Sequence, residues 1–349
     1  MIRVGIVGIG FMGWIHYLSY RGLRGLRVAA ICTRDSKRRS GDWRGIQGNF
    51  GPPGERVDLS RVATYSQLDD LLADASIDLV DLCLPPALHA EATVRALRAG
   101  KHVFCEKPIA VSSTDAKRML RAAQQTDRLL MIGHVLPLFD EYQWALQTAA
   151  NGTYGKILGG NFKRVISHPD WLPDFYDPHI VGGPMIDLHV HDAHCIRLLF
   201  GMPQAVSSQG RMRGEVVEYW NSLFHYEDSH ATVCVTGGVI QQPGRSFTHG
   251  FEVHFERATV GYELAVVDGQ AQLILPCTVY PAKGKSFRPR LGAGDPLGHF
   301  RAEVRAVAQG IQSGSVAPFL CPQAAFDALR LCHTQTEAVR VGRPVRVKA

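Results

Sequence analysis

Three glycines near the N-terminus have the spacing of a loop that binds dinucleotide phosphates. The segment from Gly8 reads GIGFMG, directly after an apolar run and before a helical pattern. In that context Gly8 permits a tight turn, Gly10 lets the backbone approach a pyrophosphate, and Gly13 lets the helix pack closely on the sheet. The first N–H groups of the helix then face the phosphates. We therefore predict a dinucleotide site that also includes Phe11 and Met12.

The residues after the second expected strand, Arg27–Cys32, bear on the choice of cofactor. An NAD site usually has Asp or Glu about 20 residues beyond the glycine loop, on the ribose hydroxyls. This chain has Thr33 and Arg34 there, with Lys37 close behind. An arginine attracts a 2′-phosphate, whereas a carboxylate would repel it. We expect these three residues to contact the cofactor and favour NADP over NAD, the alternative being a solvated helix start capped by Asp35.

A lysine follows the strand expected at His102–Cys105, in the sequence Cys105-Glu106-Lys107-Pro108. The carboxyl edge of an open parallel sheet is where ligands of such folds bind. A lysine held there beside a nicotinamide can orient a substrate hydroxyl or relay its proton, especially if burial lowers its pKa. A surface lysine in a turn is the alternative.

The densest polar cluster begins at Gly182 and reads GGPMIDLHVHDAH. If the segment is helical from Pro184, Asp187, His191 and His194 lie on one face, and His189 and Asp192 point elsewhere. A carboxylate beside a histidine is an acid/base pair, because it orients the imidazole and tunes its pKa. A divalent metal site and buried structural histidines are the alternatives. We favour acid/base chemistry without a metal.

Composition excludes several classes of protein. The chain has 349 residues, 46% of them hydrophobic and 20% charged, which suits two globular domains. No apolar run approaches the length of a membrane span, and no leader pattern precedes the first strand, so we expect a cytoplasmic protein. The eight cysteines include no CxxC pair and are expected as free thiols. The net charge of +6 is modest, and no basic block alternates with aromatics, so nucleic acid is not an expected partner.

The order of elements predicts two different folds in succession. Apolar runs alternate with helical patterns as far as residue 133, which indicates βαβ units and a parallel sheet. Beyond that point strand-like runs dominate and alternate in hydrophobicity, as in an antiparallel sheet. We expect an α/β Rossmann domain over residues 1–133 and an α+β domain with a mostly antiparallel, open-faced sheet over 134–349. Residues 40–60, rich in Gly and Pro, are expected as a loop insertion whose role stays open.

These expected elements can be given by residue range. The strands of the first domain are expected at 3–7, 27–32, 79–84, 102–105 and 129–132, and its helices at 11–24, 87–99 and 112–126. The later strands are expected at 206–210, 216–226, 231–236, 251–255 and 262–267, and the later helices at 140–150, 185–200, 299–312 and 322–341.

Together these segments resemble the Gfo/Idh/MocA oxidoreductase family, which includes inositol dehydrogenases and glucose-fructose oxidoreductase. The likeness covers GIGFMG, LPPALHAEATVRALRAGKHVFCEKPIA, LLMIGHVLPLF, the Gly155-Lys156-Ile157 segment, GGPMIDLHVHD and the closing VGRPVRV. It implies that Lys107, Asp187 and His191 are catalytic, with His191 as the acid/base. It also implies that the dinucleotide is lined by Leu84, Pro85, Pro86, His89, Glu106 and Lys107. The missing acidic residue after the second strand and the presence of His194 depart from the family pattern.

The resemblance further implies an NAD(P)-dependent enzyme that acts on a secondary hydroxyl or keto group of a sugar, inositol or related polyol. An alternative is an NAD-dependent glycosidase that works by transient oxidation with tightly bound cofactor. We expect a homo-oligomer, a dimer or tetramer, formed through the C-terminal sheet. Aromatic and hydrogen-bonding side chains suit a carbohydrate, and the candidate substrate contacts are Arg164, Trp171, Tyr176 and His194, with His168 and His179 as further candidates.

Overall fold

The computed structural model describes residues 1–170, 172, 174–227, 231–292, 295 and 297–348, and it divides into two compact units. The first comprises Met1–Leu138 and Ala293–Phe326, and the second Phe139–Gly292 and Asp327–Ala349. The first unit thus extends past residue 133, where we expected it to end, and includes a stretch that we had assigned to the second domain. No helix among the described residues is long and apolar enough to cross a membrane.

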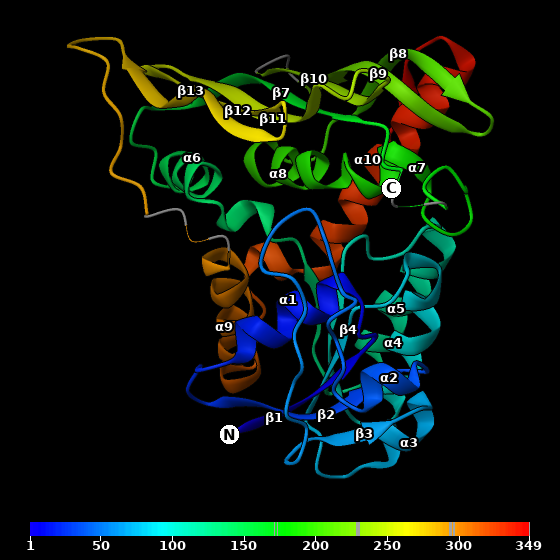
Figure 1. Cartoon of the computed structure of the whole chain (residues 1–349). Helices are drawn as coiled ribbons and strands as arrows, with labels where there is room; N and C mark the ends of the chain where they lie inside the picture. The colour runs from blue at the N-terminus through cyan, green and yellow to red at the C-terminus, as the bar shows by residue number, and fades with distance from the viewer. Residues whose placement is uncertain (171, 173, 228–230, 293–294, 296, 349) are drawn as a thin grey trace. The chain divides into compact units, whose positions relative to one another are not determined.

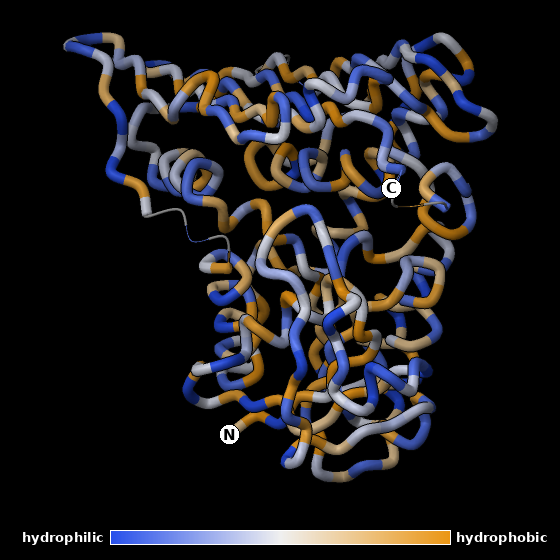
Figure 2. Tube along the Cα trace, in the orientation of Figure 1, coloured by the Kyte–Doolittle hydropathy of each residue, from blue (hydrophilic) through white to orange (hydrophobic). Residues whose placement is uncertain are grey.

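The first unit has a six-stranded parallel sheet in the order β3-β2-β1-β4-β5-β6. Hydrophobic residues gather in its strands (Figure 2). Every residue of β4 is buried. The strand order reverses between β1 and β4, which is where ligands of such sheets bind. The strands are β1 Ile2–Val7, β2 Leu26–Cys32, β3 Ala63–Tyr65, β4 Leu79–Leu82, β5 His102–Glu106 and β6 Leu130–Gly133.

Helices cover this sheet in two packed pairs. One pair is α1 with α9, and the other is α4 with α5 (Figure 1). The sequence analysis did not predict β3 or α3, because both are too short to show a clear periodicity. The helices are α1 Phe11–Tyr20, α2 Ser36–Arg39, α3 Leu68–Ala73, α4 His89–Arg98, α5 Ser113–Gln124 and α9 Gly298–Ser313.

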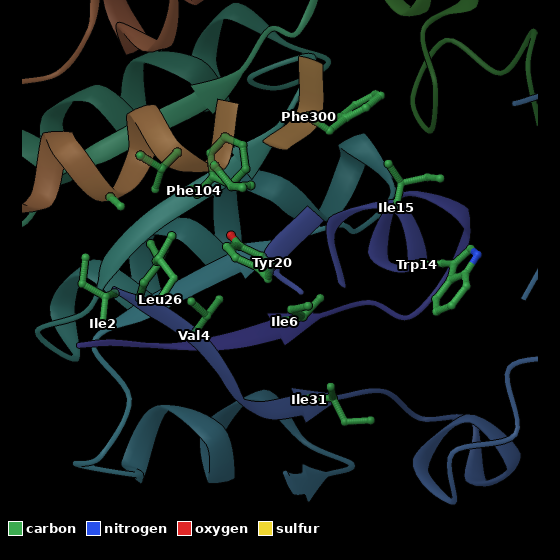
Figure 3. Packing of buried hydrophobic residues seen from close by; sticks show 14 of the residues in the cluster. Ile2, Val4, Ile6, Trp14, Ile15, Tyr20, Leu26, Ile31, Phe104 and Phe300 are labelled. Atoms are coloured by element: carbon green, nitrogen blue, oxygen red, sulfur yellow. The ribbon is translucent and has the colours of Figure 1, made fainter. Parts of the chain in front are cut away.

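The hydrophobic core of the first unit explains why α9 belongs to it. Val4 and Ile6 of β1 lie in one cluster with Phe104 of β5 and with Phe300 and Val304 of α9 (Figure 3). All five side chains are buried. An amphipathic helix becomes stable when its apolar face is covered. Here α1 and the sheet cover it, although α1 ends at Tyr20 and α9 begins only at Gly298.

The insertion at residues 40–60 packs onto α1. Trp43 is fully buried, and its ring centroid lies 5.8 Å from that of Trp14 and 4.9 Å from that of Tyr17. Phe50 stacks on Phe300 with centroids 5.5 Å apart. A backbone bridge between Asp42 and Arg56 closes its base. The segment is therefore packed into the first unit. The buried Trp43 accounts for this, whereas the many glycines suggested a loop.

The second unit has an eight-stranded sheet in the order β13-β12-β11-β7-β10-β9-β8-β14. All neighbours are antiparallel except β7 and β10, so the prediction of a mostly antiparallel sheet is confirmed. The strands are β7 Ile157–Ser167, β8 Ala205–Arg213, β9 Val216–His225, β10 Thr232–Ile240, β11 Arg245–Phe255, β12 Ala258–Val267, β13 Gln270–Pro281 and β14 Val345–Arg346. Figure 1 shows α6 and α8 along one face of this sheet, and the helices are α6 Asp140–Ala150, α7 Gly183–Asp187, α8 Val190–Phe200 and α10 Pro322–Val341.

Candidate active site

The glycine loop between β1 and α1 has the geometry expected of a phosphate-binding turn. Gly8 has a φ of +92°, and a Cβ atom there would collide with the carbonyl oxygen of Cys83. A Cβ on Gly13 would collide with the carbonyl oxygen of Gly8. Around Gly10, in contrast, no described atom lies within 4 Å of the Cβ position, which leaves room for a phosphate to approach the backbone. Since no described side chain caps α1, its first N–H groups can bind an anion.

Asp35 caps α2, as the sequence predicted. Its carboxylate accepts hydrogen bonds from the backbone N–H groups of Lys37 at 2.9 Å and Arg38 at 3.1 Å. The backbone N–H of Arg38, and then that of Lys37, lower the pKa of Asp35, with burial opposing them. The Asp35 carboxylate is therefore used to cap α2.

The basic residues around α2 divide into two groups. Arg38 donates to the carbonyl of Ile9 at 2.6 Å and so ties the turn to the glycine loop, while Arg39 donates to the carbonyl of Thr33 at 2.7 Å. Arg34 and Lys37 are exposed. Arg38 and Arg39 are only partly exposed, and the two exposed residues are the ones predicted to contact the cofactor.

The turns after β4 and β5 are joined by a buried histidine. The Nε2 atom of His89 lies 2.8 Å from the carbonyl oxygen of Leu84, and its Nδ1 atom lies 2.8 Å from that of Pro108. Pro85 and Pro86 follow Leu84 directly, so the ring connects the Pro-Pro turn to the turn that carries Lys107. His89 therefore positions the residues predicted to line a dinucleotide, and its own contact with the cofactor stays a prediction.

Glu106 and Lys107 are neighbours at the carboxyl end of β5 and differ in their surroundings. Lys107 is partly exposed, and its peptide bond to Pro108 is cis. Glu106 is only 7% exposed, and its Oε1 lies 3.0 Å from Nε2 of His16. Lys107 is therefore accessible at the end of β5, whereas the Glu106 carboxylate lies inside the first unit. That Glu106 lines the dinucleotide stays a prediction.

The polar cluster after Gly182 forms two helices, α7 and α8, where we expected one from Met185 to Phe200. The N–H of His189 donates to the carbonyl of Pro184, five residues back, and that of His191 donates to Leu188, three residues back. This replaces the regular four-residue spacing and interrupts the helix. Local breaks of this kind occur frequently at functional sites.

Within this cluster His189 and Asp192 are buried and bonded inside the second unit. Asp192 accepts two hydrogen bonds from the guanidinium of Arg164, at 2.7 and 3.0 Å. The Nε2 atom of His189 lies 2.8 Å from the side-chain nitrogen of Gln335. Asp187 and His191 remain partly exposed. The cluster thus contains two partly exposed residues, Asp187 and His191, and two buried ones, His189 and Asp192.

Two of the predicted substrate contacts are interior residues. Arg164 is fully engaged with Asp192, and its guanidinium lies 5.9 Å from the ring centroid of Phe247. His194 has no exposed surface, and burial together with the charge of Arg197 lowers its pKa to about 3. His194 therefore does not share the accessibility of Asp187 and His191. Burial favours a packing role for both residues.

The other predicted substrate contacts differ in how far the structure describes them. Tyr176 is half-buried, with the Arg213 guanidinium 3.9 Å from its ring centroid and the His168 ring stacked on it at 5.5 Å. His179 is exposed. Trp171 lies outside the described residues. Contact of any of these with a substrate stays a prediction.

The predicted catalytic trio comes from both compact units. Lys107 belongs to the first, and Asp187 and His191 belong to the second. The sequence reasoning missed a further polar group inside the first unit, formed by His16, Asp81 and Glu303. Its signal was a charged or polar residue inside an apolar run, as in WIHYL and LVDLCL. Among the described residues, the clusters with metal-ligand geometry lie there and not on α7 and α8.

Family models match both parts of the chain. Residues 2–134 match the oxidoreductase family with an NAD-binding Rossmann fold, and residues 142–261 match the Gfo/Idh/MocA C-terminal domain. The chain belongs to the Gfo/Idh/MocA family. The matched Rossmann segment contains the glycine loop and Lys107, so the predicted family, fold and oxidoreductase class are confirmed for this Gfo/Idh/MocA protein.

Individual relatives and a solved structure are also similar to this chain. 1,5-Anhydro-D-fructose reductase of Ensifer adhaerens is 28% identical over 273 residues, which cover 71% of this chain and 80% of the relative. 2,7-Anhydro-N-acetylneuraminate hydratase of Escherichia coli (strain K12) is 28% identical over 213 residues, 60% of this chain and 53% of the relative. A structure of levoglucosan dehydrogenase with NADH and levoglucosan has a TM-score of 0.80 at 18% identity, covering 100% of both chains. This last likeness shows the shared fold.

Proposed function

We propose that this Gfo/Idh/MocA protein transfers a hydride between a nicotinamide cofactor and a secondary hydroxyl or keto group of a sugar or polyol. One observation carries the proposal. Lys107 stands at the carboxyl end of β5, the same edge of the parallel sheet at which Gly10 has open space for a phosphate. The printed names of relatives, among them a fructose-derivative reductase and a myo-inositol 2-dehydrogenase, support a carbohydrate substrate.

Each predicted catalytic residue has a distinct task in this reaction. The nicotinamide, when bound, supplies the hydride acceptor for oxidation and the donor for reduction. During oxidation the imidazole of His191 accepts the hydroxyl proton while the carbon–oxygen bond becomes a carbonyl. Asp187, four residues earlier and across the break between α7 and α8, orients that imidazole. Lys107 donates a hydrogen bond to the substrate oxygen and holds it in place.

NADP is the favoured dinucleotide. Arg34 and Lys37 are exposed beside the turn after β2, and Asp35 is used as a helix cap. A 2′-phosphate can form charge-assisted hydrogen bonds with an exposed guanidinium there. NAD carries no 2′-phosphate. The position at which NAD sites usually have Asp or Glu is Thr33 in this chain.

Hydratase relatives favour a second candidate function. In this case the protein retains its nicotinamide and catalyses a reaction without net oxidation, such as glycoside cleavage through transient oxidation. The two functions are separated by assaying purified protein for bound nicotinamide. One equivalent that survives dialysis, with no net change in nicotinamide absorbance during turnover, supports the second function.

The proposed function is tested with Lys107→Ala and the matched variant Lys117→Ala, which removes an exposed lysine of α5. Loss of a positioned acid/base or orienting group costs about 10²–10⁴ in rate. We expect that loss in Lys107→Ala, measured at the nicotinamide absorbance with a panel of polyols and keto sugars. Dinucleotide affinity, measured by fluorescence titration, should stay largely intact. Equal turnover in Lys107→Ala and Lys117→Ala would remove Lys107 from the mechanism.

A further inference from the structure

Six polar side chains meet inside the first unit. They come from four elements that are far apart in the sequence, and His16, Asp81 and Glu303 have no exposed surface. The cluster consists of His16 and Tyr20 on α1, Asp81 on β4, Cys83 just after β4, Glu106 at the end of β5, and Glu303 on α9. A buried polar group of this size costs folding free energy unless its members satisfy one another.

His16 bridges two carboxylates. Its Nδ1 lies 2.9 Å from an oxygen of Asp81, and its Nε2 lies 3.0 Å from an oxygen of Glu106. The hydroxyl of Tyr20 donates to Asp81 at 3.0 Å. Ionised carboxylates only accept hydrogen bonds, so both ring nitrogens must carry a proton for both bonds to form. Burial is the largest single influence and opposes the charged ring, but Asp81 and Cys83 together raise the pKa of His16 well above its usual value.

Glu303 is the member that the hydrogen bonds leave out. Neither of its carboxylate oxygens has a partner among the described residues, although one lies within 4.8 Å of both His16 and Glu106. Three ionised carboxylates around one imidazolium would leave excess negative charge in a buried site. Burial, and then the charge of Glu106, raises the pKa of Glu303 well above its usual value. The Cys83 thiol is also neutral, because burial raises its pKa.

The cluster connects the two parts of the unit on which the proposed chemistry depends. His16 lies on α1, the helix that begins at the glycine loop, and Glu106 immediately precedes Lys107. The His16 ring also stacks on Phe104 of β5, with centroids 5.3 Å apart. A bond between His16 and Glu106 therefore holds the end of β5, and the lysine that follows it, at a defined distance from α1.

We propose that His16 is a positioning residue for Lys107, held as a doubly hydrogen-bonded imidazolium with Glu303 as a neutral carboxylic acid beside it. This inference rests on the proposed function and deepens it. His16 acts through its bond to Glu106, the residue that immediately precedes Lys107.

The charge state is tested directly on the intact protein by nitrogen NMR of labelled histidine. The His16 signals are those missing from His16→Asn. At about pH 8, where an ordinary histidine with a pKa near 6.5 is neutral, we expect both nitrogens of His16 to be protonated. A bare ring nitrogen at that pH would overturn the proposal. So would one equivalent of a divalent metal in purified protein, because the metal would then balance the carboxylates.

The positioning role is tested with three variants that differ in what they remove. His16→Asn cannot bridge both carboxylates, so kcat should fall about tenfold or more while dinucleotide affinity changes little. Glu303→Gln replaces a neutral acid with a neutral amide of the same shape, so its kcat and pH profile should match those of the wild type. His102→Asn, at the opposite end of β5, is the control and should retain wild-type kcat. A loss in Glu303→Gln equal to that in His16→Asn, or none in either, would contradict the proposal.

A measurement without turnover keeps this inference separate from the proposed function. The lysines are methylated with a carbon-13 label, and the Lys107 signal is identified by its absence from Lys107→Ala. Its titration should shift in His16→Asn and stay as in the wild type in Glu303→Gln and His102→Asn. An unchanged titration in His16→Asn would overturn the positioning role even in an active enzyme. A shifted titration supports it even if no sugar is turned over.

Discussion

His191 and His194 are three residues apart on α8, yet their surroundings give the two imidazoles different properties. His191 is partly exposed near the break after α7, where a ring can exchange a proton with a ligand. His194 is fully buried, and its pKa is lowered to about 3 by burial and by Arg197. At the residue scale, exposure rather than residue type decides which histidine can serve as an acid or base.

His191→Asn should abolish alcohol oxidation near neutral pH, because an amide cannot accept the hydroxyl proton. In the wild type the rate should rise with pH through one ionisation, since only the neutral imidazole is a base. The measurement is kcat/KM from about pH 5 to 9, with His254→Asn as a matched surface histidine. A His191→Asn enzyme that keeps the wild-type activity and its ionisation would exclude His191 as the base.

His194 should make the protein sensitive to acid. Its pKa is about 3 in the folded protein and near 6.5 in the unfolded chain, so between these values the unfolded state binds more protons. The free energy of unfolding therefore decreases as the pH falls through this range, by up to about 1.4 kcal/mol per pH unit. Urea denaturation of His194→Gln should show a shallower decrease than the wild type. Equal slopes in the two proteins would show that His194 is protonated while folded.

At the scale of elements, the turn between β2 and α2 combines a structural and a binding role. Asp35, Arg38 and Arg39 bond the backbone around them and fix the conformation of the turn. Arg34 and Lys37 project from that fixed frame and are exposed. Changes at Thr33 and Arg34 therefore leave these bonds in place and alter only the 3.3 Å bond from the backbone N–H of Asp35 to the Thr33 hydroxyl.

The double variant Thr33→Asp with Arg34→Ala should shift cofactor preference from NADP towards NAD. A charge-assisted bond to the 2′-phosphate is worth roughly 1.5–3 kcal/mol, about one to two decades in affinity. Dissociation constants for both dinucleotides, measured for wild type and variant, test this. Tighter binding of NAD than of NADP by the wild type would contradict the interpretation of the turn.

At the scale of the whole molecule, the first unit depends on a segment that follows the second unit's strands in sequence. Phe300, Val304 and Val307 of α9 and Leu320 complete the core around β1 and α1. Burial of one such side chain contributes about 1.5–3 kcal/mol. Together they approach the 5–15 kcal/mol by which a typical domain is stable.

A fragment of residues 1–138 should therefore lack a cooperative thermal unfolding transition. The physical reason is the apolar surface that α9 leaves uncovered, which a dye that binds such surface will report. Joining residues 297–326 to the fragment through a flexible linker should restore cooperative unfolding. If the short fragment already unfolds as cooperatively as the joined one, α9 is not part of the folding unit.

The sequence by itself determined the features that rest on local chemistry. The glycine loop, the Asp35 cap, the alternation of strands and helices, and the position of Lys107 after a buried strand depend on neighbouring residues, and the family models and the structure bear out the fold they imply. The same local patterns also predicted which part of the chain forms the parallel sheet and which forms the antiparallel one.

Only the tertiary structure decided which distant residues meet. Glu303 and His16 come together because α9 covers α1, and nothing near either residue indicates that partnership. The sequence analysis predicted Arg164 as a substrate contact, and in the structure Arg164 pairs with Asp192 inside the core. The break between α7 and α8 likewise depends on which carbonyl each N–H reaches. Such contacts depend on long-range packing, which periodicity and local spacing do not encode.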